Sequence, residues 1–431
     1  MSFKHIKAIE LVFEGEPVGV LAESPQSRNI YAFEYFSSWI KNGFAVNPLH
    51  LPLVSGTKAF SGLSRDTWHG LPPAIADSLP DKFGNALIDA EMARMGVSAR
   101  QITALDRLSY VADRAMGALE FRPARTLEGP EPTMLDIAEI VSAARDAFSG
   151  NIFDLNETQH AVRQLLSVGT SAGGARAKAV VNVDPGTQVL TSGQRPQAGR
   201  ESWLLKFDGI KQEGGLGESG LFGRIEYAYS LMAKDAGIDI AETRLLEEGG
   251  RAHFMARRFD RIDTKPGGIP QKIHMQSLCA MDNIDFNLLH TNDYASLFSV
   301  IRHLEMGETT ATEAFRRMAF NILAMNCDDH SKNFSFIMNE PDKWRLAPAY
   351  DLTFAYDPQS LWLKEHLMGV DGKFMDVTEG DLLAFADKYA VQYAKRVLTD
   401  IKAALTKWPC YAQRAKLPKE AADKIAKTFT E

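Results

Sequence analysis

Cysteine is scarce in this chain of 431 residues, and the three that occur, Cys279, Cys327 and Cys410, are widely separated. An odd, scattered set provides neither a disulfide framework nor the closely spaced pairs of a zinc site. The sequence also lacks a signal-peptide-like apolar core after Met1. It has no run of about 18 uncharged apolar residues, which a membrane-spanning helix would need. We therefore expect a cytoplasmic protein that works in a reducing environment and makes no contact with a membrane.

A strong excess of charge of one sign is also absent. Lysine and arginine together number 48 and aspartate and glutamate 55, which gives a net charge of -7. This balance argues against a protein that coats nucleic acid by charge alone. The stretch 395–427 is locally basic, and a solvated helix face is the simplest interpretation of it. The composition, with 45% hydrophobic and 24% charged residues, is that of a soluble globular protein, and the length predicts two or three domains.

Hydrophobic periodicity predicts a chain that mixes strands and helices. An apolar alternation within residues 6–20, interrupted at Gly15 and Glu16, predicts an antiparallel hairpin near the N-terminus. Three prolines and a glycine within residues 122–132 are typical of a linker, so the first domain boundary is expected there. Further strands are expected at 179–183, 202–207 and 254–259, and helices at 32–41, 87–95, 137–148 and 225–237, the last with Gly237 as its C-cap.

The segment most informative about function follows a predicted amphipathic helix at residues 311–325. A polar loop there leads into a hairpin expected at residues 334–346, and Asp351 comes after the hairpin. Within the loop, Asp328 and Asn333 stand at the D-x-x-x-x-N spacing of a kinase catalytic loop. Phosphoryl transfer needs one carboxylate to accept the proton of the attacking hydroxyl, and an amide and a second carboxylate to hold a metal. The order of helix, loop, hairpin and aspartate therefore predicts a phosphoryl-transfer site.

Other interpretations of this loop stay open on the spacing alone, which arises by chance in many chains. Asp328 and Asp329 could be ordinary polar residues of a solvated, capping loop. His330 follows them directly, so a metal site of histidine and aspartate is conceivable. Transition-metal sites usually collect several His or Cys ligands, however, and none cluster in this part of the sequence.

A kinase also needs cations beside the nucleotide phosphates. Lys206 lies within an apolar strand pattern, where a lysine must either point into water or meet an anion. Glu226 could pair with Lys206 as a kinase helix glutamate does, or could simply favour the N-terminus of its helix. The small residues of the segment 169–178 would let backbone N–H groups approach a phosphate, although the segment could equally be a flexible connection. Its candidate anion-binding residues are Ser171, Gly173, Gly174, Ala175, Arg176 and Lys178.

Taken together, these residues resemble the HipA family of serine/threonine kinases, which are toxins of bacterial toxin–antitoxin pairs. The resemblance rests on five segments that come in the order and spacing of that family, namely 171–178, 204–207, 258–261, 328–334 and 346–352. Residues 79–81 and 106–118 also look like the family's N-terminal part. The resemblance therefore covers nearly the whole chain, and the combination of segments is specific although each one alone is not.

The resemblance implies a role for each residue of the predicted site. Asp328 would be the catalytic base, Asn333 and Asp351 would bind Mg²⁺, and Lys206 would contact the phosphates of ATP. The other residues that it implies as ATP-binding are Ser171, Gly173, Gly174, Ala175, Arg176, Lys178, Glu226, Arg257, Phe259, His330 and Lys332. The backbone near Arg257 and Phe259 would hydrogen-bond the adenine.

A regulatory modification is also implied. Ser171 matches a serine that is autophosphorylated to switch such kinases off, and the adjacent Thr170 could be modified instead. Two departures from the family pattern lie in the same loop. A second glycine precedes Gly174, and Arg176 stands where the best-known member has a neutral amide.

The fold class expected from all of this is α+β. It is a protein-kinase-like two-lobed fold with an additional N-terminal α/β region and an all-helical C-terminal lobe. The expected domains are 1–125, 126–261 as the small lobe, and 262–431 as the lobe with the catalytic loop. Implied partners are a small DNA-binding antitoxin of HipB type, DNA only through that antitoxin, and a protein substrate such as an aminoacyl-tRNA synthetase. A small-molecule phosphotransferase and a catalytically weak, antitoxin-bound corepressor remain as alternatives.

Overall fold

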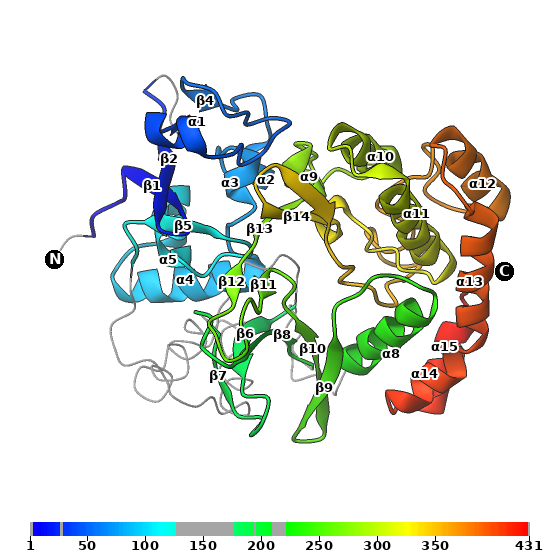
Figure 1. Ribbon diagram of the computed structural model, residues 1–431. Helices are drawn as coiled ribbons and strands as arrows, with labels where there is room; N and C mark the ends of the chain where they lie inside the picture. The colour runs from blue at the N-terminus through cyan, green and yellow to red at the C-terminus, as the bar shows by residue number, and fades with distance from the viewer. Residues whose placement is uncertain (1–2, 26–28, 126–175, 194, 209–220, 430–431) are drawn as a thin grey trace. The chain divides into compact units, whose positions relative to one another are not determined.

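The computed structural model describes residues 3–25, 29–125, 176–193, 195–208 and 221–429, coloured along the chain in Figure 1. These residues form two compact units. Unit 1 contains the described residues up to 208 together with 246–276, and unit 2 contains 221–245 together with the described residues from 277 onward. The expected boundaries after residues 125 and 261 stay a prediction.

An antiparallel five-stranded sheet begins unit 1, with the strand order β4-β3-β2-β1-β5. Its strands are β1 (Ala8–Phe13), β2 (Glu16–Glu23), β3 (Tyr31–Tyr35), β4 (Lys58–Ala59) and β5 (Leu119–Arg122). The turn between β1 and β2 has Glu14 and Gly15 at positive φ, which suits a tight two-residue hairpin. The predicted N-terminal hairpin is therefore confirmed, with its turn one residue earlier than expected, because Glu16 begins β2.

The helix expected at residues 32–41 is wrong in its first half. β3 occupies Tyr31–Tyr35, and only the short helix α1 (Ser37–Asn42) follows it. Tyr31, Phe33 and Tyr35 are buried while the residues between them are more exposed, which is the two-residue period of a strand. Aromatic residues also pack well on a pleated surface, so tertiary packing decided this segment.

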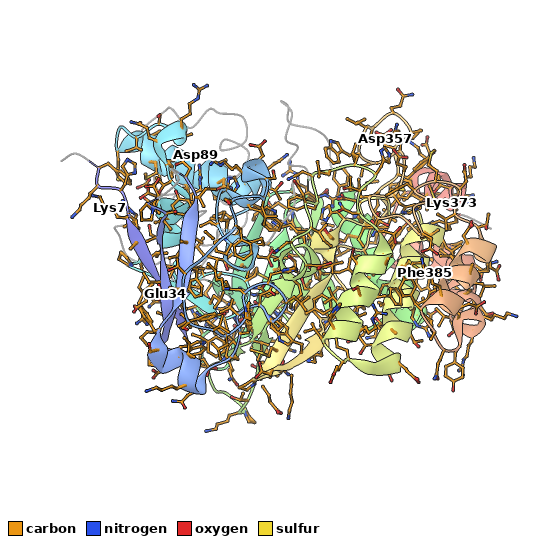
Figure 2. The ribbon with its side chains drawn as sticks, turned by 90° about the horizontal axis from the view of Figure 1, so that it is seen from above. Lys7, Glu34, Asp89, Asp357, Lys373 and Phe385 are labelled. Carbon is orange, nitrogen blue, oxygen red and sulfur yellow. The ribbon has the colours of Figure 1, made fainter. Side chains whose placement is uncertain are left out.

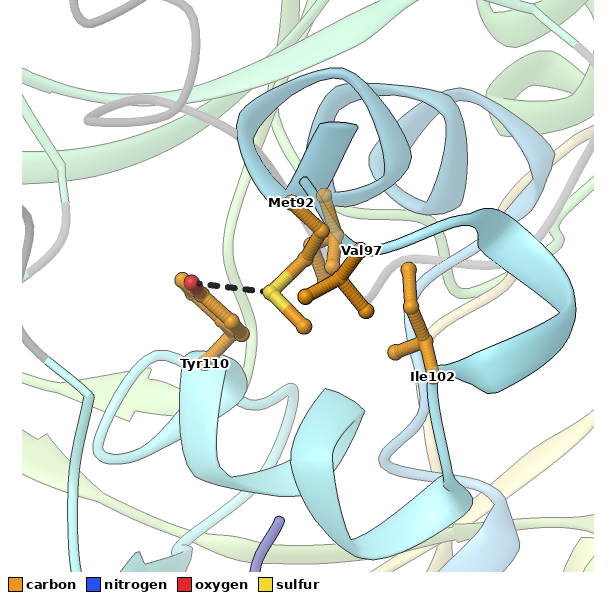
Figure 3. Packing of buried hydrophobic residues seen from close by; sticks show 5 residues of the cluster. Met92, Val97, Ile102 and Tyr110 are labelled. Carbon is orange, nitrogen blue, oxygen red and sulfur yellow. Dashed lines mark hydrogen bonds between the residues drawn. The ribbon is translucent and has the colours of Figure 1, made fainter. Parts of the chain in front are cut away.

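Helices complete the N-terminal part of unit 1. They are α2 (Arg65–Trp68), α3 (Pro73–Ala76), α4 (Lys82–Arg94), the 3₁₀ helix η1 (Ala99–Gln101) and α5 (Ala104–Val111). The helix predicted at 87–95 is confirmed within α4. A buried apolar cluster contains residues of α4, of the segment between α4 and α5, and of α5. Within this cluster, drawn in Figure 3, the Tyr110 hydroxyl donates to the Met92 sulfur at a distance of 3.3 Å.

A second five-stranded sheet in the order β7-β6-β8-β10-β9 follows. Its strands are β6 (Lys178–Val183), β7 (Leu190–Ser192), β8 (Glu201–Lys206), β9 (Thr243–Glu248) and β10 (Arg251–Arg257). β6 pairs antiparallel with β7 and β8, and β8 pairs antiparallel with β10. The strands expected at 179–183 and 202–207 are confirmed, and the one expected at 254–259 begins earlier and ends at Arg257. The short strands β11 (Arg261–Ile262), β12 (Gln271–Lys272) and β13 (His274–Ser277) come next.

Unit 2 is mostly helical. Its helices are α8 (Phe222–Asp235), α9 (Leu278–Met281), α10 (Tyr294–His303), α11 (Gly307–Leu323), α12 (Glu379–Lys388), α13 (Ala394–Thr406), α14 (Trp408–Arg414) and α15 (Lys419–Ala426). α8 packs against α13 and α14, and α11 packs against α10 and α13. Gly237 has a positive φ just after the end of α8, which ends the helix as predicted.

Strands are also present in unit 2, so the expectation of an all-helical C-terminal lobe is corrected. β14 (Ser335–Glu340) and β15 (Lys343–Leu346) form an antiparallel hairpin. Buried side chains of β14 such as Phe336 and Ile337 give it a core face, so the hairpin is stabilised by packing.

Helix α12 shows how local sequence fixes the ends of elements in unit 2. Thr378 and Asp381 form a reciprocal capping box at its N-terminus, and Lys373 donates to Asp381 at 2.6 Å. The buried Phe385 packs edge-on against Phe298 of α10, with ring centroids 5.1 Å apart. Lys373 and Phe385 are labelled in Figure 2. Among the described helices of the chain, none is long and apolar enough to cross a membrane.

Candidate active site

The loop that follows α11 carries the predicted catalytic residue. The predicted apolar face of α11 is buried, and Met325 has a positive φ where the chain leaves the helix. The side chain of Asp328 is 49% exposed, so its carboxylate is accessible. The Asn333 side-chain amide donates to the Asp328 backbone carbonyl at 2.8 Å. Because this bond uses the amide nitrogen, the amide oxygen of Asn333 is turned away from that carbonyl and is an acceptor for another group.

Asp351 is held against this loop from both sides. The Asn326 amide donates to the Asp351 backbone carbonyl at 3.4 Å, and the Tyr350 hydroxyl donates to the Lys332 carbonyl at 2.7 Å. Asp351 itself has a φ of 55°, in the left-handed region that few residues other than glycine adopt. Such a backbone persists only where its surroundings fix it, and it is frequent at functional sites. The structure thus brings Asp328, Asn333 and Asp351 into one cluster of loops within unit 2.

The donor atoms of this cluster suit Mg²⁺. Asn333 and Asp351 offer an amide oxygen and a carboxylate, which are the ligands that Mg²⁺ prefers. The buried side-chain oxygen of Asn326, whose amide nitrogen donates to Asp351, has no hydrogen-bond partner, so an acceptor beside Asp351 is not satisfied by protein atoms. Among the described residues, no group of three or more His, Cys, Asp or Glu side chains is arranged to hold a metal. Asn333 and Asp351 suit a cation that is bound by two protein groups and completed by phosphate oxygens and water.

His330 and Lys332 lie next to Asp328 on the same loop. The His330 Nε2 atom is 3.7 Å from the Asp328 carboxylate. The ring of Phe286 packs against His330 at 5.9 Å between centroids, and the Lys332 ammonium lies 5.0 Å from the same ring. Phe286 therefore orders both polar side chains through an apolar contact and a cation–π contact. Their predicted role in nucleotide binding stays a prediction.

The sequence analysis missed the residue that anchors this loop from inside. Asp329 is fully buried, and its carboxylate accepts hydrogen bonds from the Tyr294 hydroxyl at 2.7 Å and from His366 Nδ1 at 3.0 Å. It also accepts from the backbone N–H groups of Leu367 and Met368. The doubled aspartate was a visible signal in the sequence, but nothing there connected it to a histidine 37 residues later.

Two predicted phosphate-binding lysines are neighbours in unit 1. Lys178 on β6 and Lys206 on β8 are directly opposite each other across the antiparallel ladder, so their side chains leave the same face of the sheet. Both are buried. The Lys178 ammonium lies 3.6 Å from the carboxylate of Asp81, and the Lys206 ammonium lies 5.8 Å from the ring of Phe254. Two buried ammonium groups on one face favour the presence of an anion beside them.

The predicted adenine-binding backbone lies at the end of β10. The Arg258 N–H donates to the Ser202 carbonyl at 2.9 Å, which continues the pairing of β10 with β8 beyond Arg257. The Arg257 side chain forms ion pairs with Glu201 and with Asp263, at 3.2 and 2.7 Å. These ion pairs fix the side chain of Arg257, while an adenine contact through the backbone of this segment stays a prediction.

Of the remaining predicted residues, some are described by the structure and others are not. Glu226 is buried on α8 and belongs to unit 2, whereas Lys206 belongs to unit 1, so their pairing stays a prediction. Arg176 is partly exposed just before β6. Thr170, Ser171, Gly173, Gly174 and Ala175 lie outside the described residues, as does the helix expected at 137–148.

Comparison with known families agrees with the order of these elements. Residues 9–122 match the HipA N-terminal domain, and residues 170–409 match the HipA-like C-terminal domain. The chain belongs to the HipA family. The HipA-like C-terminal match contains all the predicted site residues, and the N-terminal match covers the first sheet of unit 1 except for Ala8.

Individual HipA-like relatives are distant in sequence. The "Putative kinase Y4mE" of Sinorhizobium fredii (strain NBRC 101917 / NGR234) is 24% identical over 367 residues, which are 81% of this chain and 78% of that protein. A "Putative kinase" of Haemophilus influenzae is 27% identical over 164 residues, which are 34% of this chain and 46% of that protein.

A solved HipA structure has the same fold. A chain from the complex of Shewanella oneidensis MR-1 HipA, HipB and operator DNA superposes with a TM-score of 0.67 and 17% identity. The superposition covers 97% of this chain and 94% of that one. The mixed helix-and-strand fold is therefore that of HipA over nearly the whole length.

Proposed function

We propose that this HipA-family chain is an ATP- and magnesium-dependent kinase that phosphorylates serine or threonine hydroxyls of a protein. The observation that carries the proposal is the loop cluster of unit 2. There Asn333 is bonded to the carbonyl of Asp328, and Asp351 is held in a left-handed conformation against the same loop. The names of the curated relatives as kinases support the same reading.

Each residue of the cluster would have a distinct task. The accessible Asp328 carboxylate would accept the proton of the attacking hydroxyl and orient its oxygen. Asn333 and Asp351 would hold Mg²⁺, which when bound neutralises the charge of the transferred phosphoryl group. The hydrogen bond from Asn333 to the Asp328 backbone links the base to the metal ligand, so the two move together.

The two lysines of unit 1 would serve the phosphates of ATP. Lys178 and Lys206 are buried on one face of the β6-β8 ladder, where a fixed positive charge stabilises an anion without reorganisation. Asp81 balances part of this charge beside Lys178. Arg176 and the residues Ser171, Gly173, Gly174 and Ala175 would complete this phosphate site. Glu226 stays a predicted nucleotide-binding residue.

The proposed partners follow from family membership. The solved Shewanella structure is a complex of HipA with HipB and operator DNA, which supports a small DNA-binding antitoxin of HipB type for this chain. The net charge of -7 argues against strong DNA binding by the chain alone, so we expect its contact with DNA to be made through that antitoxin. A protein of translation, such as an aminoacyl-tRNA synthetase, is the proposed substrate, and the toxin of a toxin–antitoxin pair is the proposed role.

Autophosphorylation of Ser171 would inactivate the enzyme. A phosphoserine adds nearly two negative charges, which would compete with ATP for Arg176 and Lys178. Peptide mass spectrometry after incubation with MgATP tests this directly. We expect phosphate on Ser171, or on Thr170 beside it, together with a loss of turnover. An active preparation without phosphate on either residue would refute self-inactivation and leave the kinase assignment intact.

Titration with MgATP tests the metal assignment. Calorimetry should show that Asp351→Ala and Asn333→Ala each weaken MgATP binding, and that Mg²⁺ removal by EDTA has the same effect on the parent. Lys206→Ala should weaken binding of ATP whether or not Mg²⁺ is present. MgATP affinity in Asp351→Ala equal to that of the parent would contradict the metal role. Transfer of the γ-phosphate to small hydroxyl compounds, but not to protein in a cell lysate, would replace a protein kinase by a small-molecule phosphotransferase.

A further inference from the structure

A buried carboxylate stands directly beside the proposed catalytic base. Asp329 has no exposed surface, and its carboxylate accepts four hydrogen bonds. The Tyr294 hydroxyl donates at 2.7 Å, His366 Nδ1 at 3.0 Å, and the backbone N–H groups of Leu367 and Met368 at 2.7 and 3.3 Å. The donors belong to α10 and to the segment around residue 367, so one side chain ties both of them to the loop.

The partner of Asp329 is a charged histidine. Burial opposes the charged form of His366, but the Asp329 carboxylate and the hydrogen bond to it outweigh burial and raise the pKa of His366 to about 10. The imidazole is therefore protonated at neutral pH, and the two groups form a buried ion pair. Removing one partner of such a pair leaves an uncompensated buried charge, which is strongly unfavourable. Burial first, and then Asp329, hold the pKa of Tyr294 well above its usual value, so Tyr294 stays a neutral donor.

The hydrogen bonds continue from Asp329 to the residue proposed to bind the metal. The Tyr294 hydroxyl accepts from the Asn321 amide at 3.0 Å, and the Asn321 amide oxygen accepts from Asn326 at 2.9 Å. The Asn326 amide also donates to the Asp351 carbonyl at 3.4 Å. One continuous buried network thus connects the neighbour of the base to the backbone of Asp351.

We propose that Asp329 and His366 are positioning residues, whose ion pair holds the Asp328 loop in register with Asp351. This inference rests on the kinase function proposed above. The Asp328 side chain is half-exposed. Asp328 directly precedes Asp329 in the chain, so the four hydrogen bonds to the Asp329 carboxylate also fix the backbone that carries Asp328. In buried networks of this kind, fully satisfied groups rigidify a loop, whereas a missing member loosens it.

The substitution Asp329→Asn tests the pair with little change of volume. The amide oxygen of asparagine can still accept from Leu367, but the ion pair with His366 is lost. Because a base displaced by a fraction of an ångström reacts poorly, we expect turnover to fall about 10- to 100-fold. The KM for MgATP should change by less than about 3-fold, since a loss confined to the transition state lowers kcat and leaves ground-state binding intact. His366→Gln should show the same separation of kcat from KM.

The matched control is His290→Gln. His290 and Glu365 form another histidine–carboxylate pair in unit 2, at 2.7 Å, but the His290 side chain is 53% exposed. An exposed pair contributes little to order, so turnover of this variant should equal that of the parent. Tyr294→Phe removes one hydroxyl from the network and keeps the ring. Tyr294→Phe replaces Asp329→Asn in the test if Asp329→Asn fails to fold. We expect Tyr294→Phe to lower kcat by a smaller factor and to leave KM unchanged.

Hydrogen exchange provides a readout that does not depend on activity. In Asp329→Asn, or in Tyr294→Phe, peptides covering residues 326–334 and 364–370 should exchange faster, while the rest of unit 2 keeps its protection. A folded variant with the parent's turnover, with equal losses in kcat and MgATP affinity, or with unchanged exchange in both peptides would overturn the positioning role. A parent protein without turnover would refute the proposed kinase function itself, and the exchange of these peptides would then decide alone whether the pair holds the loop.

Discussion

The charge of His366 depends strongly on the folded state around it. Its pKa of about 10 in the fold lies above the ordinary 6.5, with Asp329 at its Nδ1 atom and Cys327 4.0 Å from its Nε2 atom. A group whose pKa is raised by folding stabilises the fold fully below its unfolded pKa. That stabilisation is lost as the pH rises from about 6.5 to about 10.

The prediction concerns the stability difference between the parent and His366→Gln. We expect the free energy of unfolding of the parent to exceed that of the variant most at pH 6, and the difference to shrink steadily up to pH 10. Denaturant titrations at several pH values measure it, and subtracting the variant removes the contribution of other titrating groups. A difference that is constant or grows with pH would show that His366 is not protonated in the fold.

The individual polar residues of the proposed site were predicted from the sequence, but the buried side chains that hold their loop in place were not. Asp328, Asn333 and Asp351 were predicted because phosphoryl transfer fixes their types, spacing and order along the chain. His366 and Tyr294 were not predicted, because their bonds to Asp329 span 37 and 35 residues and follow no local pattern. Only the fold brings these donors to the buried carboxylate.

At the scale of elements, the start of α5 shows how a helix cap can organise a domain. Thr103 and Asp106 form a reciprocal capping box there. The buried Asp106 carboxylate also accepts from the Ile6 backbone N–H at 3.0 Å and contacts the His5 ring at 2.8 Å. One side chain therefore caps α5 and holds the residues that lead into β1.

We predict that Asp106→Asn lowers the free energy of unfolding of unit 1 by about 1 to 3 kcal/mol, because buried donors lose their charged acceptor. The matched control is Asp89→Asn, since Asp89 pairs with Arg107 at 2.7 Å but its side chain is 33% exposed, and partly exposed pairs contribute less than buried ones, about 1 kcal/mol or less at the surface. Chemical denaturation of both variants measures the difference. Equal losses in the two variants would contradict the role assigned to Asp106.

Helices and strands whose hydrophobic residues follow one clear period were predicted well. Elements whose type or start depends on tertiary contacts were not. The helix within 87–95 was found, yet its start at Lys82 was missed, because the cap depends on Asp81, whose carboxylate accepts from the Gly84 N–H at 2.7 Å. The strand β3 was taken for a helix, because its aromatic residues fit either period until the neighbouring strands are known.

At the scale of the whole molecule, a cluster of buried charged side chains connects the two sheets of unit 1. The Asp260 carboxylate, fully buried, accepts from Arg258 and Arg261, and also from the Gly117 N–H at 2.7 Å. Arg261 in turn donates to the carbonyls of Gly117 and Ala115. Burial opposes the charged form of Asp260, but the two arginines outweigh it and hold the pKa well below its usual range. Residues 115–117 precede β5, so the cluster joins the N-terminal sheet to the end of β10.

This cluster predicts cooperative unfolding of unit 1. Asp260→Asn should lower its stability by about 3 to 5 kcal/mol, because two buried arginines lose their counter-charge. Asp263→Asn is the control, since Asp263 pairs with Arg257 at an exposed position. Hydrogen exchange should show β1 and β8 losing protection together in Asp260→Asn. Loss of protection in β8 alone would show that the two sheets are stabilised independently.

The order of the domains was predictable from the motifs, but the connection between the two sheets of unit 1 was not. The proline-rich segment within 122–132 indicated a boundary, and residues 258–261 were predicted only as a family mark. The structure shows that Arg258, Asp260 and Arg261 of that segment bond to each other and to residues 115–117, so their chemistry is structural. Contacts of this kind leave no periodic signal in the sequence.

The central claim, that Asp328 is the base of a phosphoryl-transfer site, is tested most directly by one comparison. The rate of γ-phosphate transfer from MgATP is measured for the parent and for Asp328→Asn, with folding checked by thermal unfolding. Asparagine keeps the volume of aspartate but cannot accept the proton, so we predict an unchanged unfolding temperature, retained MgATP binding and no detectable transfer. A folded Asp328→Asn variant that transfers phosphate at nearly the parent's rate would contradict the assignment.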